Sequence, residues 1–174
     1  MSDMIELIEP QIPGLRRYAR SLLRDAAAAD DLVQDCLERA ITRWHQRRED
    51  GEVRSWLFTI LHNLAINQMR QTKRRGRAVA LEDAPEPAAR AAQEDGLRQK
   101  DILDMVGTLP EEQRSVLLLV TVEDFSYAEV ARMLDIPTGT VMSRLSRARE
   151  RLRQTMEEGE TGMAPRTSHL RRIK

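Results

Sequence analysis

The sequence predicts an all-α protein that consists of two small helical domains joined by a flexible linker. Composition is the first indication, because 41% of the 174 residues are apolar and 32% are charged, with two residues each of Trp, Tyr and Phe. This balance suits amphipathic helices better than sheets. Second, apolar residues recur at helical spacing in two separate blocks. Third, residues 78–96 combine prolines, acidic residues and alanines without an apolar stripe, which is typical of a linker.

The first predicted helix runs from Asp30 to Trp44. Its apolar face follows the spacing of one helical face and consists of Leu32, Val33, Cys36, Leu37, Ala40, Ile41 and Trp44. Polar and acidic residues at helical spacing form another face, which consists of Asp31, Gln34, Asp35 and Glu38. Periodicity alone leaves two interpretations of this acidic face open, a solvated surface and a docking surface for a partner.

A second amphipathic helix is predicted from Trp56 to the basic run RQTKRRGR, residues 70–77. A polar stripe separate from its apolar face consists of Asn63, Asn67, Arg70 and Arg74. Five of the eight residues of the run are basic. Cations at this density repel one another unless an anion is near, which favours nucleic acid as the partner over a solvated helix end.

The C-terminal block begins with TLPE, residues 108–111. We expect Thr108 to cap a helix here, with Pro110 in its first turn and Glu111 at the third position of a capping box. The apolar run QRSVLLLVTV then continues this helix.

A helix-turn-helix is predicted after this run. SYAE contains a second capping box, formed by Ser126 and Glu129, and opens a short helix. Residues 135–137, Asp-Ile-Pro, end that helix, and the last helix runs from about Thr138 past Leu152. Two helices joined by so short a turn have the helix-turn-helix spacing.

The last predicted helix is amphipathic and rich in arginine. At about 100° per residue, its core-facing sector consists of Val141, Leu145, Ala148 and Leu152. The opposite sector consists of Met142, Ser143, Ser146, Arg147 and Glu150, flanked by Arg144, Arg149, Arg151 and Arg153. Outward serine and arginine side chains are typical of a recognition helix in a DNA major groove, and a purely structural hairpin does not need them. Arg147 is the first candidate for base readout, because a guanidinium can pair bidentately with guanine.

Several classes of function are disfavoured. Cys36 is the single cysteine and has no metal-ligand spacing to the three histidines, which predicts packing, although a redox role stays open. We expect no metal, no cofactor and no enzymatic activity, because no nucleophile, base and orienting group converge. Without a signal sequence or an apolar run of about 18 residues, we expect a cytoplasmic protein with no membrane insertion. The formal net charge of zero conceals a division, +6 over residues 12–77 and −4 over residues 78–107.

Motifs in both blocks resemble a family of bacterial transcription factors. The N-terminal motifs are DDLVQDCLERA and WLFTILHNLAINQMR, and the C-terminal motif is SYAEVARMLDIPTGTVMSRLSRARERL. They resemble regions 2 and 4 of the extracytoplasmic-function (ECF) sigma factors of the sigma-70 family. This resemblance implies an alternative sigma factor that directs RNA polymerase to the promoters of a stress response. It also implies the domain limits, with region 2 over 10–77 and a region 4 helix-turn-helix over 97–156, on either side of the linker over 78–96. The tail over 157–174 resembles no part of the family, and we expect it to be disordered.

The resemblance also assigns roles to individual residues. Those implied to contact polymerase are Asp31, Gln34, Asp35 and Glu38. Those implied to bind the minus-ten element, together with the loop HQRREDGEVRS at residues 45–55, are His62, Asn63, Asn67, Arg70, Lys73, Arg74 and Arg75. Those implied to bind the minus-thirty-five element are Thr140, Met142, Ser143, Arg144, Ser146, Arg147 and Arg149. The implied partners are core RNA polymerase, through its β′ clamp helices and β flap, promoter DNA and an anti-sigma factor.

This sequence departs from the family at two positions of the recognition helix. Position 142 is often basic in relatives and position 146 is often bulkier, whereas this chain has Met142 and Ser146. The promoter sequence therefore cannot be copied from a relative. One alternative function is a sigma-like decoy that sequesters an anti-sigma factor. Such decoys are expected to lose the basic patches, which this chain retains.

Overall fold

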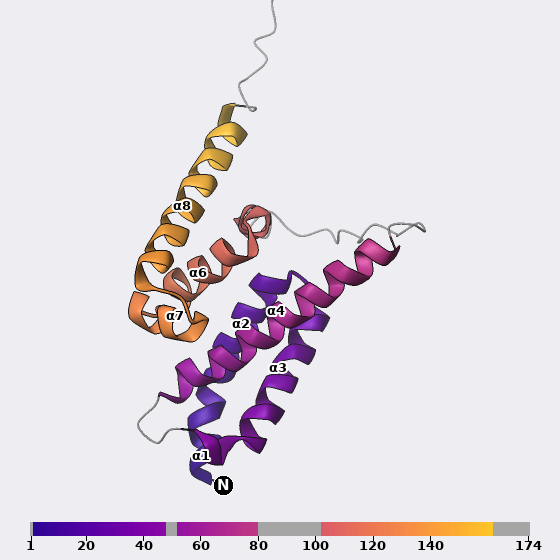
Figure 1. Ribbon diagram of the computed structural model, residues 1–174, viewed down its shortest axis with the longest axis vertical. Coiled ribbons are helices and arrows are strands. Elements are labelled where there is room, and N and C mark those ends of the chain that lie inside the picture. Colours follow the sequence, from indigo (N-terminus) through magenta and orange to yellow (C-terminus); the bar gives the residue numbers. More distant parts are fainter. Residues whose placement is uncertain (1, 48–51, 80–101, 162–174) are drawn as a thin grey trace, which may run out of the picture.

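The computed structural model describes residues 2–47, 52–79 and 102–161, and no strand occurs among these residues. The helices form two bundles that lie against each other, an N-terminal bundle over residues 2–79 and a C-terminal bundle over residues 102–161 (Figure 1). The prediction of an all-α fold is therefore confirmed. Most of the predicted linker, residues 80–96, lies outside the described residues.

The N-terminal bundle consists of α1 (Ser2–Ile8), the 3-10 helix η1 (Glu9–Gln11), α2 (Ile12–Leu23), α3 (Ala26–Thr42), the 3-10 helix η2 (Trp44–Gln46) and α4 (Val53–Val79). The C-terminal bundle consists of a helical segment over residues 102–108, α6 (Glu111–Thr121), α7 (Tyr127–Leu134) and α8 (Thr138–Thr161). In the N-terminal bundle α2, α3 and α4 pack against one another, and in the C-terminal bundle α8 packs against α6 and α7.

Helix α3 begins four residues earlier than the sequence predicted. Arg24 ends α2 in the left-handed conformation with φ 60°, and the Asp25 side chain then accepts a hydrogen bond from the Ala28 amide at 3.0 Å. An aspartate cap of this kind satisfies an amide that the first helical turn leaves unpaired. The short connection sets α2 and α3 side by side, so their apolar faces meet.

The predicted apolar faces form the interior of the N-terminal bundle. Fully buried side chains include Leu15, Leu22, Leu57 and Leu61. Cys36 is also fully buried, and burial raises the pKa of its thiol to about 12. The thiol is therefore protonated at neutral pH, which agrees with the predicted packing role.

The predicted capping of α6 by Thr108 is wrong, whereas the capping box of α7 is confirmed. Thr108 lies in the last turn of the preceding helical segment, where its hydroxyl donates to the Met105 carbonyl at 2.7 Å. Pro110 occupies the N-cap position of α6 without a side-chain hydrogen bond. At α7 the Ser126 hydroxyl accepts from the Glu129 amide and the Glu129 carboxylate accepts from the Ser126 amide.

Helix α8 extends into the predicted disordered tail. Residues 157–161 are helical. Arg153 pairs through its guanidinium with the carboxylates of Glu150 at 2.7 Å and of Glu157 at 2.5 Å. Pairs at these spacings stabilise an exposed helix, so the helix continues past the residue where its apolar face ends.

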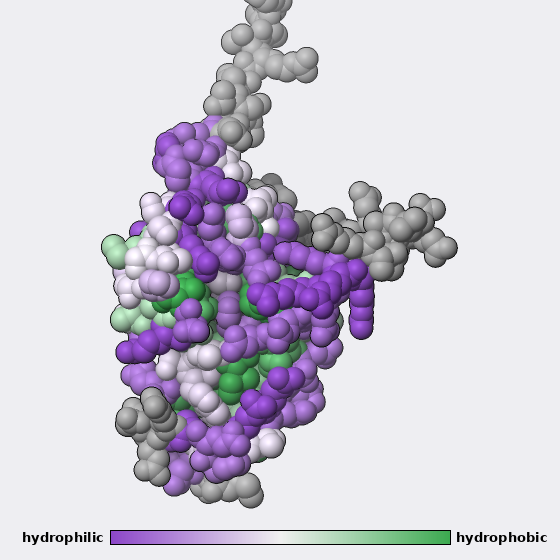
Figure 2. Space-filling model, in the orientation of Figure 1, coloured by the Kyte–Doolittle hydropathy of each residue, from purple (hydrophilic) through white to green (hydrophobic). Residues whose placement is uncertain are grey.

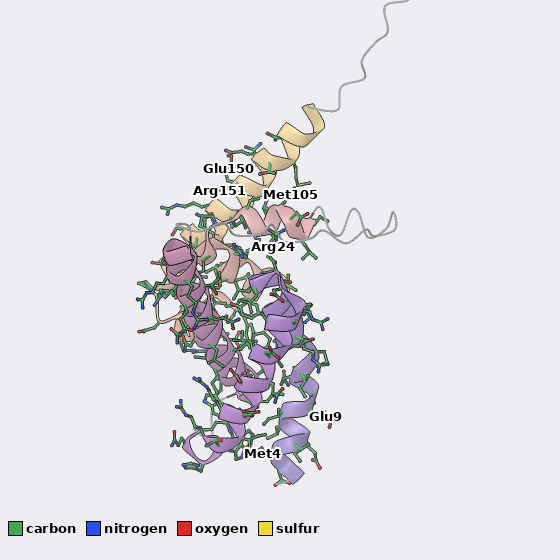
Figure 3. The ribbon with its side chains drawn as sticks, turned by 90° about the vertical axis from the view of Figure 1, so that its right-hand side faces the viewer. Met4, Glu9, Arg24, Met105, Glu150 and Arg151 are labelled. Atoms are coloured by element: carbon green, nitrogen blue, oxygen red, sulfur yellow. The ribbon has the colours of Figure 1, made fainter. Side chains whose placement is uncertain are left out.

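The two bundles share a continuous set of buried apolar side chains. Helix α2 packs on α6, and α4 packs on α7. The rings of Phe58 and Phe125 meet edge to face across this contact, with centroids 5.1 Å apart. Arg24 lies beside the helical segment that carries Met105 and forms an ion pair with Asp104 (Figure 3).

The surface is mostly polar. On the face seen in Figure 1, hydrophilic side chains cover most of the molecule, and apolar side chains reach the surface in small patches (Figure 2). Helices of this kind, apolar on one side and charged on the other, leave their polar faces free for interactions with charged partners.

Candidate polymerase and nucleic-acid interfaces

The acidic face of α3 is exposed along its whole length. Its residues are Asp31, Gln34, Asp35 and Glu38, and each is exposed. The Gln34 amide donates to the Glu38 carboxylate at 3.0 Å. Because the apolar face of α3 is buried against α2 and α4, these carboxylates point away from both bundles. The structure thus presents together all four residues predicted to contact polymerase.

A surface of amide and basic side chains lies on the exposed part of α4. The exposed residues of this surface are Asn63, Asn67, Arg70, Lys73, Arg74 and Arg75. They lie along one helix, so the amides precede the basic residues in the direction of the helix axis. Lys73 is 71% exposed and lies 3.5 Å from the Glu111 carboxylate of α6. Contacts with a phosphate backbone need accessible cations of this kind.

His62 differs from the other residues predicted to bind the minus-ten element. Its ring is partly buried, and Nδ1 lies 2.9 Å from the hydroxyl of buried Tyr18. Burial lowers the pKa of His62 to about 4, so the imidazole is neutral at pH 7. The structure therefore places His62 in the bundle interior rather than on the exposed basic surface.

The outward face of α8 carries most of the residues predicted to bind the minus-thirty-five element. Exposed residues are Met142, Ser143, Ser146, Arg147 and Arg149, whereas Thr140 and Arg144 are partly buried. Arg144 pairs with Glu112 of α6 at 3.0 Å. This ion pair holds the Arg144 guanidinium against its own bundle. Val141, Leu145 and Ala148 are buried as predicted.

A contact that joins three charged residues of the two bundles was not predicted from the sequence. Arg17 of α2 and Arg54 of α4 both approach the fully buried carboxylate of Glu123, which follows α6. Their separations in sequence from Glu123 are 106 and 69 residues. A periodic pattern reports the faces of one helix, and no pattern in the sequence connects residues so far apart.

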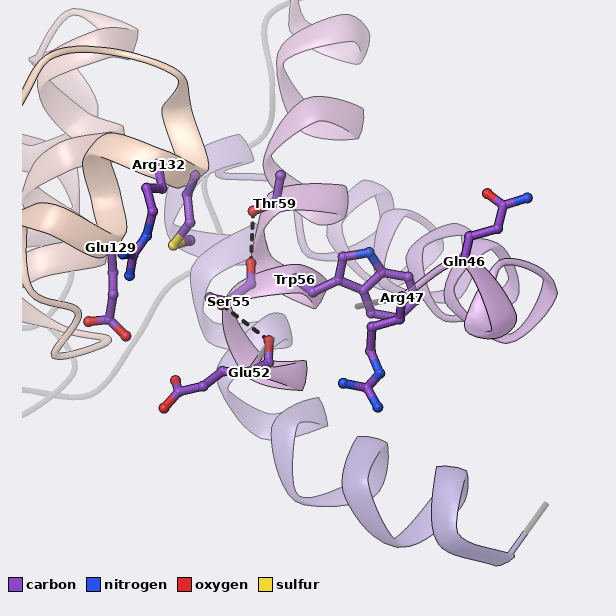
Figure 4. A pocket seen from close by; sticks show the side chains of 9 residues that line it. Gln46, Arg47, Glu52, Ser55, Trp56, Thr59, Glu129 and Arg132 are labelled. Carbon is purple, nitrogen blue, oxygen red and sulfur yellow. Dashed lines mark hydrogen bonds between the residues drawn. The ribbon is translucent and has the colours of Figure 1, made fainter. Parts of the chain in front are cut away.

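A pocket at the same contact is lined by both bundles (Figure 4). From the N-terminal bundle, Glu52 and Ser55 belong to the loop that the resemblance assigns to the minus-ten element, and Trp56 follows them. Glu129 and Arg132 of α7 line the opposite side. The C-terminal bundle therefore stands beside this loop.

Both bundles match known family models. Residues 8–62 match the model described as the Sigma2 domain of PhyR, and residues 99–152 match that of Sigma-70, region 4. The ECF RNA polymerase sigma factor EcfG of Rhodopseudomonas palustris (strain TIE-1) is 35% identical over 146 residues, which are 81% of this chain and 78% of that protein. The chain belongs to the ECF RNA polymerase sigma factors. Another member, SigM of Mycobacterium tuberculosis, is 37% identical over 86% of this chain and 74% of its own length.

The arrangement of the two bundles also resembles that of a solved sigma-factor structure. The sigma factor RpoE of Bartonella quintana, crystallised with the anti-sigma factor NepR, is 31% identical and gives a TM-score of 0.80. This comparison covers 90% of this chain and 98% of the other, so it extends over both bundles. CnrH in complex with the cytosolic domain of CnrY gives a TM-score of 0.70 at 22% identity, a likeness of fold.

The described residues contain neither a metal-binding cluster nor a membrane-spanning helix. Within residues 2–47, 52–79 and 102–161, no cluster of His, Cys, Asp or Glu has the arrangement of a metal site. In the same part of the chain, no helix has the length and apolar character that a membrane span requires. The ECF sigma factors are a family of transcription initiation factors.

Proposed function

We propose that this ECF sigma factor binds core RNA polymerase through the acidic face of α3 and holds promoter DNA through α4 and α8. One observation carries this proposal: an acidic surface and two basic surfaces lie on three different helices and are all exposed. Opposite charges kept apart in this way suit simultaneous binding of a protein and of DNA. The promoters proposed are those of a stress response.

The polymerase contact is proposed for Asp31, Gln34, Asp35 and Glu38, with the β′ clamp helices as the partner. All four side chains point away from the fold, so association needs no rearrangement of the N-terminal bundle. Charge complementarity of this kind raises the rate of association and fixes the register of two surfaces.

The minus-ten contact is proposed for the exposed surface of α4. Asn63 and Asn67 have amide groups that can hydrogen-bond the edge of an unstacked base, and flipping such a base costs a few kcal/mol. The basic residues that follow them, Arg70, Lys73, Arg74 and Arg75, are suited to phosphate contacts. His62 supports this surface through Tyr18 and does not supply a positive charge.

The minus-thirty-five contact is proposed for the outward face of α8 in a major groove. Arg147 has the geometry for bidentate pairing with guanine, and Ser143 and Ser146 can bond to several base edges. Arg144 reaches a phosphate only if it exchanges Glu112 for DNA. Met142 is 53% exposed and offers an apolar contact, which suits a thymine methyl group.

An anti-sigma factor and the β flap are further proposed partners. The solved relative RpoE binds the anti-sigma factor NepR, and its fold matches this chain over both bundles. A decoy function is the alternative, because the matching N-terminal model is named after PhyR, which another solved complex with NepR describes as an anti-anti-sigma factor. The exposed acidic and basic surfaces favour the sigma factor.

Reconstituted transcription tests the proposal. Core polymerase with this protein is expected to initiate at a subset of promoters that core alone ignores. Changing Asp31 and Asp35 to lysine reverses the charge of the acidic face, and we expect at least tenfold weaker core binding, equivalent to about 1.4 kcal/mol. The measurement is the affinity for core polymerase by fluorescence anisotropy, with helicity followed by circular dichroism.

The matched control changes Glu6 and Glu9 to lysine, because these two residues are also exposed acids of the N-terminal bundle. This variant has the same net charge and should bind core as the wild type does. Equal weakening of both variants would remove the assignment to α3. Binding of an anti-sigma factor without any core binding would instead establish the decoy.

A further inference from the structure

An open pocket lies beside the outward face of α8. It has a volume of about 370 Å³ and is bounded by the first residue of α7 and by the N-terminal half of α8. Its lining includes Tyr127 of α7 together with Met142, Ser146 and Arg149 of α8. This α7–α8 pocket therefore continues the surface proposed to bind the minus-thirty-five element.

Apolar side chains line one part of the α7–α8 pocket. Leu145 is 2% exposed and closes the pocket toward the core. Tyr127 and Met142 are 37% and 53% exposed, so a phenol ring and a thioether are accessible to a ligand. The capping box of Ser126 and Glu129 fixes the first turn of α7, and with it the backbone that carries Tyr127. An apolar site is thus preformed within a polar face.

Glu150 also lines the α7–α8 pocket, but its carboxylate is bound within α8. The Arg153 guanidinium donates to both oxygens, from Nε to Oε2 at 3.1 Å and from Nη2 to Oε1 at 2.7 Å. The Gln154 amide donates to Oε1 at 2.8 Å. A free carboxylate would accept a hydrogen bond from the N4 amino group of cytosine. Because this carboxylate already has three donors, recognition of cytosine in the pocket is disfavoured.

The charges around the α7–α8 pocket favour duplex DNA as its occupant. Arg149 lines the pocket, and Arg147 lies on the outward face of the same helix, where both are exposed. Guanidinium groups of this kind bind phosphates and position a duplex. In a helix-turn-helix the second helix enters the major groove and the first crosses the backbone. Tyr127, at the start of the first helix, would then stand at the edge of the groove.

Thymine has the base edge that fits this lining. Of the four bases, only thymine presents a methyl group in the major groove, next to its O4 acceptor. Tyr127 and Met142 can contact the methyl group, and the Ser146 hydroxyl beside them can donate to O4. Met142 and Ser146 are also the two positions at which this recognition helix departs from the family. A bulkier side chain at position 146 would fill part of the pocket, so its shape depends on the residues of this chain.

We propose that the α7–α8 pocket receives the methyl group of a thymine in the minus-thirty-five element, and that Tyr127 acts with Met142 as a specificity-determining residue for that base. The inference rests on the proposed function, because it places α8 in the major groove of that element. It adds a residue of α7 to the readout and names the base that is read there.

Deoxyuridine tests this contact, because it pairs with adenine as thymidine does and lacks only the C5 methyl group. The probe is a promoter fragment at which the reconstituted holoenzyme initiates. Each thymine of its minus-thirty-five element is replaced in turn, on either strand, and the affinity of the holoenzyme is measured by fluorescence anisotropy. At one thymine we expect the wild type to bind about fourfold more weakly without the methyl group, the effect of burying one group of that size.

Tyr127→Ala and Met142→Ala each remove an apolar wall, and we expect the fourfold ratio to fall below about twofold in both. Tyr127→Phe keeps the ring and should keep the wild-type ratio. Met156→Ala is the matched control, because Met156 lies in the same helix and is 55% exposed. It stands about 21 Å further along the helix at 1.5 Å per residue, so the ratio should not change. Far-UV circular dichroism shows whether each full-length variant stays folded.

A minus-thirty-five element without thymine, or one in which every thymine can be replaced without loss, would overturn the proposal. So would a ratio that stays fourfold in Tyr127→Ala and Met142→Ala, since another residue would then contact the methyl group. A ratio that falls equally in Met156→Ala would remove the assignment to the pocket. If Tyr127→Ala loses helicity, Met142→Ala decides, because its side chain lies outside the core.

The same experiment separates this inference from the proposed function. A wild-type holoenzyme that initiates at no promoter would contradict both. Unchanged affinity for every deoxyuridine fragment of an active promoter would contradict the thymine contact alone.

Discussion

The interior of the N-terminal bundle and the contact between the bundles are built from different chemistry. The interior consists of close-packed leucines and aromatic rings, and Tyr18 meets Phe58 there at 5.7 Å between centroids. The contact contains Phe58 and Phe125 as well, and the Arg54 guanidinium lies over both rings. The cations that reach across to the C-terminal bundle are Arg17, Arg24, Arg54 and Lys73.

This difference in chemistry indicates which interactions cost more free energy to break. Exposing apolar side chains costs about 25 cal/mol for each Å², and water offers no compensation for it. Arginines and carboxylates regain hydration when they separate, whereas buried Phe58 and Phe125 of the same contact would be exposed to water. The contact therefore combines ion pairs, whose members can be solvated separately, with buried aromatic rings that favour the docked arrangement.

The largest expected effect on stability comes from a cavity in the interior of the N-terminal bundle. Leu61 is fully buried, and Leu61→Ala leaves a cavity, so we expect the free energy of unfolding to fall by about 2 to 5 kcal/mol. Urea unfolding followed by circular dichroism measures this loss. Ile5→Ala is the control, since Ile5 is 53% exposed and its loss should change stability by about 0.5 kcal/mol or less. Equal losses in the two variants would contradict the comparison.

Arg114 belongs to both the C-terminal bundle and the contact. Its guanidinium donates to the Leu22 carbonyl at 2.7 Å across the contact and to the Gly107 and Leu109 carbonyls at 3.0 Å within its own bundle. Arg114→Lys keeps the positive charge but loses the planar guanidinium with its several N–H donors. We therefore expect the free energy of unfolding to fall by about 1.5 to 3 kcal/mol. Hydrogen exchange should accelerate at the amides of residues 102–109. Unchanged exchange there would show that the carbonyls do not depend on Arg114.

His62 provides a pH-dependent test of the interior, because its imidazole is held neutral there. Its pKa is about 4 in the folded chain and 6.5 ordinarily. The unfolded chain therefore takes up the proton first, so this stabilisation is present above pH 6.5 and is lost as the pH falls toward 4. We expect His62 to account for about 1 to 2 kcal/mol of the loss between pH 6.5 and 4.5, after a discount for partial exposure.

His62→Gln removes the titrating group and should flatten this part of the stability profile. Unfolding free energies of both proteins at several pH values provide the measurement. A variant whose stability falls as steeply as that of the wild type would assign the pH dependence to carboxylates elsewhere.

The smallest effect on stability is expected at the rim of the contact. Lys73 and Glu111 are 3.5 Å apart, and the lysine is 71% exposed, so Lys73→Gln should change unfolding free energy by about 0.5 kcal/mol or less. The same change removes one proposed phosphate contact. We therefore expect the slope of log affinity for DNA against log salt to fall by about 1. A large loss of stability would mean that this rim pair holds the bundles together.

The helices and most of the exposed surfaces were predictable because their signals are local. The apolar spacing in α3 and α4, the Ser126 capping box of α7 and the outward face of α8 each depend on residues within one helix. The acidic residues of α3 are exposed for the same reason, since burial of one face leaves the other to water. The roles of these surfaces came from the family resemblance, not from periodicity.

Local signals failed where another element supplied the partner. The Thr108 hydroxyl donates to the Met105 carbonyl of the preceding helical segment, although the sequence TLPE predicts a capping box. The family resemblance assigned His62 to the minus-ten surface, yet its ring is partly buried beside Tyr18 of α2. Arg144 was predicted to bind DNA, whereas in the structure its guanidinium pairs with the Glu112 carboxylate of α6.

The sequence by itself determined that the chain forms two amphipathic bundles with acidic and basic faces, because helical periodicity and capping act over a few residues. Tertiary structure alone decided that Glu123 is buried between Arg17 and Arg54. A carboxylate in a polar loop carries no sign of its burial. Its environment is set by helices that meet it from 106 and 69 residues away, and such a meeting exists only once both bundles have folded and docked.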